Sequence, residues 1–137
     1  NIFDLDTLKI KPLICYESIF GELSHNQDID LLCVITNDGW WKETAGYKHH
    51  FSYSRLRAIE QRKAIIRSAN TGISGVIDID GSILEKTSWD QELALPFNVN
   101  CYDRSTFYNK NGDYIGRLAS FLSGLLLIIT FVKTRIS

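Results

Sequence analysis

The sequence predicts an α/β fold that is followed by a membrane-spanning helix. Apolar runs of strand length alternate with segments of helical periodicity, and turn signals separate them. Toward its C-terminal end the chain also contains a long stretch without charge, residues 118–132. Elements that alternate in this way usually form one layered sheet with helices on its faces. We therefore expect a single domain over residues 1–113, a helix over 114–132 and a short tail over 133–137.

The first two strands are predicted at residues 8–16 and 30–36. In the first, Leu8 and Ile10 alternate with lysines, and Pro12 indicates an edge position or a local irregularity. The second is a continuous apolar run with β-branched residues, which is typical of a strand buried on both faces. We interpret the two as adjacent strands of one sheet.

A hairpin and one further strand are predicted later in the chain. Residues 74–79 alternate as a strand, and Asp80-Gly81 is a strong signal for a two-residue turn that returns through residues 82–84. Residues 93–101 also have the pattern of a strand.

Helical periodicity is strongest at residues 51–69. Four apolar residues recur there at helical spacing among charged ones: Leu56, Ile59, Ile66 and Ala69. This pattern predicts a long amphipathic helix, which the Asn-Thr-Gly turn at residues 70–72 would end. A short helix is also expected at residues 17–26.

The composition is that of a folded protein without an obvious charged partner. Hydrophobic residues make up 45% of the chain and charged residues 23%, which is ordinary for a globular domain. The net charge of -1 gives no reason to expect a nucleic-acid partner. Because the 137 residues include no methionine and open without an obvious first element, we expect them to be a piece of a longer protein.

The uncharged C-terminal stretch has the length of a membrane span. From Tyr114 to Val132 the only charge is Arg117, and a helix of that length spans about 28 Å, close to the hydrocarbon core of a bilayer. Lys133 and Arg135 follow at once, which favours a cytoplasmic C-terminus by the positive-inside rule. The alternative is the buried core helix of a soluble domain.

Two predicted strands end in polar residues that could do chemistry. Cys15 lies at the end of the first predicted strand, and Asn37-Asp38 follow the second. Ligands of open α/β sheets gather at the carboxyl ends of the strands, so a thiol there could act as a nucleophile if a neighbour lowered its pKa. The N–H of Tyr16 could help to stabilise an oxyanion. Taken alone, a cysteine in this position is more often structural.

Other polar and aromatic residues lie near these strand ends in the sequence. Trp40 and Trp41 suit a rim that faces lipid or substrate, or a packed lid. His49 and His50 could be ligands or bases, but without a third partner they are better interpreted as residues that start a helix or support the site. The three cysteines form no C-x-x-C pair, so neither a metal nor another cofactor is predicted.

Several motifs occur together in a recognisable order. They are residues 13–17 (LICYE), 36–41 (TNDGWW), 50–60 (HFSYSRLRAIE) and 67–74 (RSANTGIS). Over roughly residues 8–81 this order resembles the C-terminal half of the nitrilase, or carbon–nitrogen hydrolase, superfamily. Within it, the Cys-Tyr-Glu triplet, the Asn-Asp-x-Trp loop, residues 106–108 with 112–113, and the terminal apolar span are similar to the bacterial apolipoprotein N-acyltransferase family.

The resemblance implies a partial αββα nitrilase-type sandwich followed by a transmembrane helix. It also implies a Glu–Lys–Cys triad, in which Cys15 matches the nucleophile and Glu17 matches a further glutamate of the active site. The triad glutamate and lysine lie upstream in the family, and no residue of this chain matches them. This chain is therefore expected to be inactive alone. Tyr16 is expected beside the cysteine, and Asn37, Asp38, Trp40 and Trp41 in substrate binding.

The implied reaction transfers an acyl chain from a phospholipid, through a cysteine thioester, to the N-terminal amine of a diacylglyceryl apolipoprotein. The implied location is the bacterial inner membrane, with a periplasmic catalytic domain and a cytoplasmic C-terminus. The chain departs from the family's pattern in the loop that follows the two tryptophans, where the family often has Gly-Pro and this chain has Gly46-Tyr47. Two alternatives remain open: an amidase that hydrolyses small carbon–nitrogen substrates with the same cysteine, and a non-catalytic membrane-tethered module.

Overall fold

A mixed six-stranded sheet forms the centre of the part of the chain that the structure describes, residues 2–25 and 28–136 in a computed structural model. Its strands follow the order of the sequence: β1 (Phe3–Asp4), β2 (Lys9–Ile14), β3 (Leu31–Thr36), β4 (Ala64–Ala69), β5 (Gly75–Ile77) and β6 (Ile83–Lys86). β2, β3 and β4 are parallel neighbours, and the outer strands are antiparallel. The parallel trio places three carboxyl strand ends at one edge.

Residues 1 and 137 begin the predicted catalytic domain and end the predicted cytoplasmic tail, and both lie outside the described residues. Residues 26–27, at the end of the predicted short helix, do so as well. The remainder of that predicted helix is divided between a 3-10 helix at Cys15–Ile19 and the short α1 at Gly21–Ser24. The break between them falls at Phe20, whose backbone is extended.

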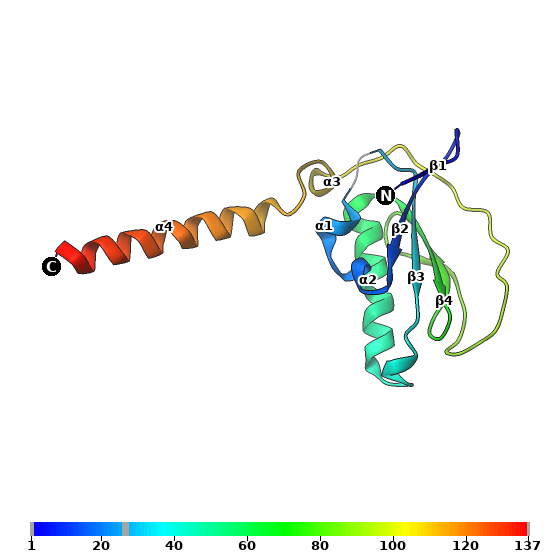
Figure 1. Ribbon diagram of the computed structural model, residues 1–137. Coiled ribbons are helices and arrows are strands. Elements are labelled where there is room, and N and C mark those ends of the chain that lie inside the picture. The colour runs from blue at the N-terminus through cyan, green and yellow to red at the C-terminus, as the bar shows by residue number, and fades with distance from the viewer. Residues whose placement is uncertain (1, 26–27, 137) are drawn as a thin grey trace.

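One long helix covers one face of the sheet. α2 (Ala45–Gln61) lies along the parallel strands, as Figure 1 shows. Their shared core consists of buried aliphatic residues and one aromatic ring: Leu13, Ile29, Leu32, Val34, Phe51, Ala58, Ile65 and Ile77. The described chain thus supplies one helix layer on one sheet layer, which confirms the predicted α/β class and matches half of an αββα sandwich.

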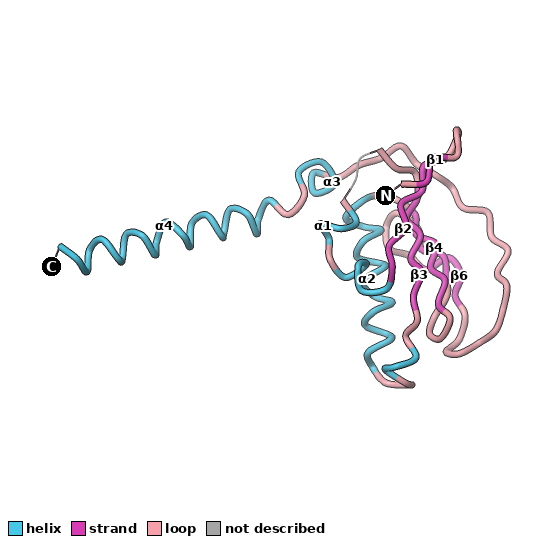
Figure 2. Tube along the Cα trace, viewed as in Figure 1, coloured by secondary structure: helices cyan, strands magenta, loops and turns pink. Residues whose placement is uncertain are grey.

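The opposite face of the sheet is partly open. Ile35, at the end of β3, is 53% exposed, so the prediction that this strand is buried on both faces is wrong. An extended segment crosses beside the sheet from the end of β6 (Figure 2). It includes residues 93–101, where a strand was predicted and the structure has neither strand nor helix. Pro96 has no backbone N–H to donate to a ladder, and neither Leu93 nor Phe97 is buried.

The long helix predicted at residues 51–69 is the main correction. α2 begins six residues earlier, at Ala45, and ends at Gln61, where Arg62 adopts a left-handed φ of 52°. Residues 64–69 form β4, which pairs with β3 on one side and β5 on the other. The two β-branched isoleucines within β4 favour an extended backbone, and the two ladders stabilise it.

Two further helices follow the extended segment. α3 (Phe107–Asn111) docks on the end of α2 and is capped by Thr106, whose hydroxyl accepts a hydrogen bond from the backbone N–H of Asn109 at 2.9 Å. The side chain of Asn109 donates to the buried Gln61 at 2.5 Å. These bonds fix the segment that precedes the last helix.

α4 (Tyr114–Ile136) projects away from the sheet, as Figure 1 shows. Residues 114–135 form a candidate membrane span, in which a window of 18 residues has a mean hydropathy of 2.0, and none of that window is buried against the rest of the described chain. At its start the backbone N–H of Asp113 donates to Glu22 at 2.6 Å, and Arg117 forms an ion pair with Glu22 at 3.6 Å. The predicted apolar helix is therefore present, and it is not a core helix of the described domain.

Candidate functional site at the carboxyl ends of the parallel strands

Cys15 lies directly after β2 in a strained backbone conformation. Its φ of 51° is left-handed, which costs a residue with a side chain about 1–2 kcal/mol. Two local hydrogen bonds hold the turn: Glu17 accepts from the backbone N–H of Ile14 at 2.6 Å, and Ser18 donates to the carbonyl of Cys15 at 2.7 Å. The thiol is half-buried at the carboxyl end of a parallel strand, where ligands of α/β sheets bind.

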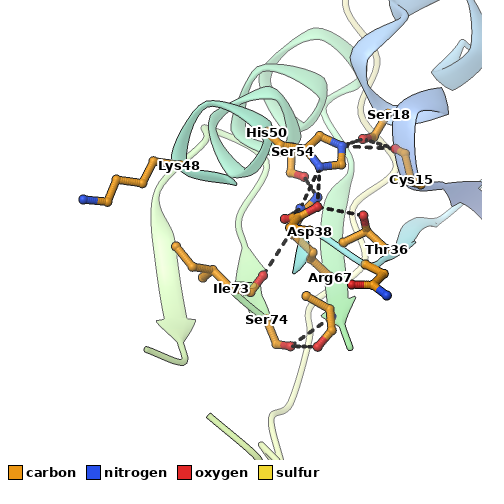
Figure 3. A network of polar contacts seen from close by, with 12 residues as sticks. Cys15, Ser18, Thr36, Asp38, Lys48, His50, Ser54, Arg67, Ile73 and Ser74 are labelled. Carbon is orange, nitrogen blue, oxygen red and sulfur yellow. Dashed lines mark hydrogen bonds and ion pairs between the residues drawn. The ribbon is translucent and has the colours of Figure 1, made fainter. Parts of the chain in front are cut away.

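Asp38 organises the end of β3 from a fully buried position. One carboxylate oxygen accepts from the hydroxyl of Thr36 at 2.9 Å and contacts Nδ1 of His50 at 2.8 Å. The other accepts from Nη2 of Arg67 at 2.7 Å. Figure 3 shows how these side chains, which come from β3, α2 and β4, converge on the carboxylate. The predicted helix-start position of His50 is wrong, because the residue lies within α2 and is 1% exposed.

The electrostatics of the cluster keep Asp38 ionised. Burial alone would raise the pKa of Asp38, but the hydrogen bond from His50 and the charge of Arg67 outweigh it, so the pKa lies below its usual value. Burial lowers the pKa of Arg67, and the neighbouring carboxylate opposes that shift. The guanidinium stays charged, because arginine is not deprotonated in proteins. The two therefore form a buried ion pair.

His50 connects this ion pair to the cysteine turn. Its Nε2 lies 3.0 Å from the hydroxyl of Ser18 and 3.2 Å from the carbonyl oxygen of Cys15. Ser18 is itself fully buried. A continuous chain of polar contacts thus runs from Arg67 on β4 to the backbone of the candidate nucleophile.

An aromatic group covers the outer side of His50. The ring of Tyr16 stacks on the imidazole at 5.8 Å and 24°, and Trp41 meets it at 5.3 Å and 64°. Trp40 packs edge-on against Tyr16 at 5.8 Å and is 68% exposed. Trp41 also lies where a side chain on Gly46 would be, since a Cβ there would be 2.5 Å from its ring. The loop after β3 therefore packs against both Tyr16 and α2.

Gly46 and Tyr47, where this chain departs from the family's Gly-Pro, belong to a regular helix. Both residues lie in the first turn of α2, a place where proline is also tolerated, so the backbone does not depend on which residue follows Gly46. Tyr47 is buried, and its ring packs at 4.2 Å against Trp89 beyond the hairpin. The tyrosine thus adds a contact that a proline could not make.

The structure brings most of the predicted site residues together. Cys15, Tyr16, Trp40 and Trp41 are linked by direct contacts or through His50. Asn37 is exposed, and its side chain accepts from the backbone N–H of Gly39 at 3.0 Å, so it shapes the loop.

Ser18 and Thr36 are members of the network that the sequence did not single out. Hydroxyl residues next to a strand end occur in many loops, and only the contacts with Cys15 and Asp38 distinguish these two. Within residues 2–25 and 28–136, no group of three or more histidine, cysteine or acidic side chains could hold a metal ion.

The family of the chain follows from a match to a family model. Carbon–nitrogen hydrolase is the family whose model matches, over residues 1–96. This chain belongs to the carbon–nitrogen hydrolase family. A solved CN-hydrolase superfamily protein from Xanthomonas campestris has the same fold, with a TM-score of 0.57 at 22% identity over 68% of this chain and 40% of that one.

Curated relatives narrow the resemblance to apolipoprotein N-acyltransferases. The enzyme named so in Rickettsia bellii is 45% identical over 135 residues, which cover 94% of this chain and 25% of the relative. That of Chlorobaculum tepidum is 35% identical over 135 residues, 96% of this chain and 25% of the relative. The chain thus spans about a quarter of the length of these relatives. The resemblance inferred from the motifs is confirmed.

Proposed function

We propose that this chain carries the nucleophile of a lipoprotein N-acyltransferase, and that the nucleophile is Cys15. The observation that carries the proposal is the position of its thiol: half-buried, at the carboxyl end of a parallel strand, on a backbone held in a left-handed conformation. Strain of this kind persists only where surrounding contacts enforce it, and it is concentrated at functional sites. The names of the relatives supply the reaction class.

The proposed reaction has two acyl transfers. The thiolate of Cys15 attacks an ester carbonyl of a phospholipid, so a C–S bond forms, the C–O bond breaks and the departing alkoxide takes a proton. The N-terminal amine of a diacylglyceryl apolipoprotein then attacks the thioester, so a C–N bond forms, the C–S bond breaks and the thiol regains its proton. Because the thiolate and not the thiol is the nucleophile, the first step needs a base that removes the thiol proton.

The surrounding residues have distinct proposed roles. The backbone N–H of Tyr16 is proposed to donate to the oxyanion, and Glu17 to maintain the turn through its bond to Ile14. Trp40, with its exposed ring, is proposed to contact the acyl chain, next to Trp41 and Asn37 at the rim. Asp38 was predicted to bind substrate. With no exposed surface and both oxygens engaged, it is better suited to a positioning role.

Trapping the acyl-enzyme tests the proposal. Incubating the full-length protein with phospholipid, without the lipoprotein acceptor, is expected to add one acyl chain to Cys15 and none to Cys33 or Cys101, as peptide mass spectrometry would show. Hydroxylamine should release the chain, because thioesters are more labile to it than amides are. Hydrolysis of small amides without any thioester-linked lipid would favour the amidase instead. No modification of Cys15 by lipid or by a thiol-reactive lipid phosphonate would favour the non-catalytic module.

We also propose that α4 spans the bacterial inner membrane with Lys133 and Arg135 on the cytoplasmic side and Cys15 in the periplasm. A reporter that is active only in the cytoplasm is expected to be active when fused after residue 136. A cysteine introduced there should resist a membrane-impermeant thiol reagent in intact spheroplasts. Labelling of that cysteine without lysis would reverse the orientation.

A further inference from the structure

The hydrogen atoms around His50 can be assigned from its partners. Because Asp38 is ionised and can only accept, Nδ1 of His50 must donate across their 2.8 Å contact. Its 3.2 Å approach to Nη2 of Arg67 is then a packing contact, since both nitrogens carry hydrogen. The remaining nitrogen, Nε2, faces Ser18 and Cys15.

Three atoms form a tight polar triangle on that side. Ser18 Oγ lies 2.7 Å from the carbonyl oxygen of Cys15, and Nε2 lies 3.0 Å from Ser18 Oγ and 3.2 Å from the same carbonyl. The carbonyl can only accept, and the single hydroxyl hydrogen is used in the shortest of the three contacts. Nε2 of His50 therefore lies within hydrogen-bond distance of both polar atoms of the cysteine turn, the Ser18 hydroxyl and the Cys15 carbonyl.

We propose that His50 is a positioning residue for the reaction, and that its Nε2, in contact with Ser18 and the Cys15 carbonyl, holds the left-handed turn that presents the thiol. The inference rests on the proposed role of Cys15 as the nucleophile. His50 can do this because it is itself fixed on every side. Asp38 binds its other nitrogen, and the rings of Tyr16 and Trp41 pack against it. A 1% exposed ring with these contacts has no freedom to turn away.

The same contacts make His50 the connection between the nucleophile and the loop after β3. Asp38 precedes the 3-10 helix at Gly39–Trp41, and its backbone N–H donates to Thr71 at 2.8 Å. If this loop moved, Asp38 would therefore move His50, and His50 would in turn displace the Cys15 carbonyl that it contacts. The two tryptophans that we place at the substrate rim belong to this loop.

Replacing His50 by asparagine or by glutamine distinguishes the role of Nδ1 from that of Nε2. Asparagine places its amide at the reach of Nδ1, so His50→Asn keeps the bond to Asp38 and loses the contacts with Ser18 and Cys15. Glutamine places its amide at the reach of Nε2, so His50→Gln keeps the contacts with Ser18 and Cys15 and loses the bond to Asp38. Both variants are uncharged and lose the aromatic stacking equally, which makes them controls for one another.

In the full-length protein, His50→Asn is expected to slow formation of the Cys15 thioester about 10²-fold at saturating phospholipid, with KM little changed, because misplacement of a reacting group has a cost of this size. His50→Gln is expected to stay within about threefold of the natural rate, since its amide keeps the contacts that hold the cysteine turn in place. Equal slowing of the two variants, or a natural rate in His50→Asn, would overturn the proposal. If His50→Asn does not fold, His50→Gln decides alone: a rate near the natural one supports the role, and a large loss refutes it.

A second measurement keeps this inference separate from the proposed function. Alkylation of Cys15 by iodoacetamide needs no lipid, and peptide mass spectrometry can follow it. We expect the alkylation rate to change more than about threefold in His50→Asn and to remain within that range in His50→Gln, since the two differ only in which contact persists. If the natural protein forms no thioester, the proposed function fails, yet this comparison still decides whether His50 positions Cys15. Equal alkylation rates in all three proteins would refute the positioning role.

Discussion

Replacement of Cys15 by alanine is expected to abolish acyl transfer by the full-length protein, with a loss of at least about 10³-fold, because no other group can form the thioester. Replacement by serine should be nearly as damaging, since a hydroxyl is far less ionised than a thiol at neutral pH. Alanine is smaller than cysteine and causes no clash at this half-buried position, so folding should be retained.

The other cysteines of the chain provide matched controls. Cys33 lies within β3, and burial raises the pKa of its thiol, which lowers its reactivity. Cys101 is exposed in the extended segment, where partial desolvation and the nearby charge of Asp30 raise the pKa of its thiol as well. Cys33→Ala and Cys101→Ala are therefore expected to keep acyl transfer, measured as N-acylation of a diacylated lipopeptide. Natural activity in Cys15→Ala would refute the assignment of the nucleophile.

The parts of the fold that the sequence predicts well are those where one local pattern has one structural solution. The apolar run that became β3 and the Asp80-Gly81 hairpin are of this kind, and the structure places them within a residue or two of the predicted bounds. The apolar terminal helix was equally clear. In each case the hydrophobic pattern and the turn signal agree, so tertiary contacts have nothing to override.

The errors arise where two periodicities overlap. Ile66 and Ala69 continue the helical spacing of the residues before them, yet they also fit a strand, and the neighbouring strands decide between the two. Only the pairing of β4 with β3 and β5, which joins residues far apart in the sequence, makes the extended form more stable. The predicted strand at residues 93–101 failed for the opposite reason, because no neighbouring strand pairs with it.

The location of the site could be predicted from the sequence, but the contacts among its residues could not. The strand-end rule located Cys15 and Asp38 at one edge of the sheet, and the structure has both there. It could not show that Asp38 is buried or that His50 turns inward to reach Cys15. Both depend on where α2 begins, which the sequence pattern misplaced by six residues. His50 differs from the exposed His49 only in the face of the helix that it occupies.

Replacement of Arg67 by methionine is expected to destabilise the domain by about 3–5 kcal/mol, the usual cost of removing one partner of a buried ion pair. The guanidinium has no exposed surface and bonds Asp38, the hydroxyl of Ser54 and the carbonyl of Ile73. Methionine fills a similar volume but leaves the carboxylate of Asp38 buried with only His50 and Thr36 as partners. Exposed Arg55, which donates to the carbonyl of Gly81, gives the matched control, and Arg55→Met should lose far less.

A double substitution distinguishes a charge effect from a packing effect. Asp38→Asn/Arg67→Met removes both charges of the ion pair, so the double variant is expected to recover at least about 1 kcal/mol relative to Arg67→Met alone. Urea titration of the full-length protein in detergent, followed by brief proteolysis of the unfolded fraction, measures the free energy of unfolding of the natural protein, of both single variants and of the double variant. If the double variant is as unstable as the sum of the two single variants, Arg67 stabilises the domain through its packing and its bonds to Ser54 and Ile73. In that case the ion pair with Asp38 contributes little, and the fixed position of His50 depends on the surrounding rings.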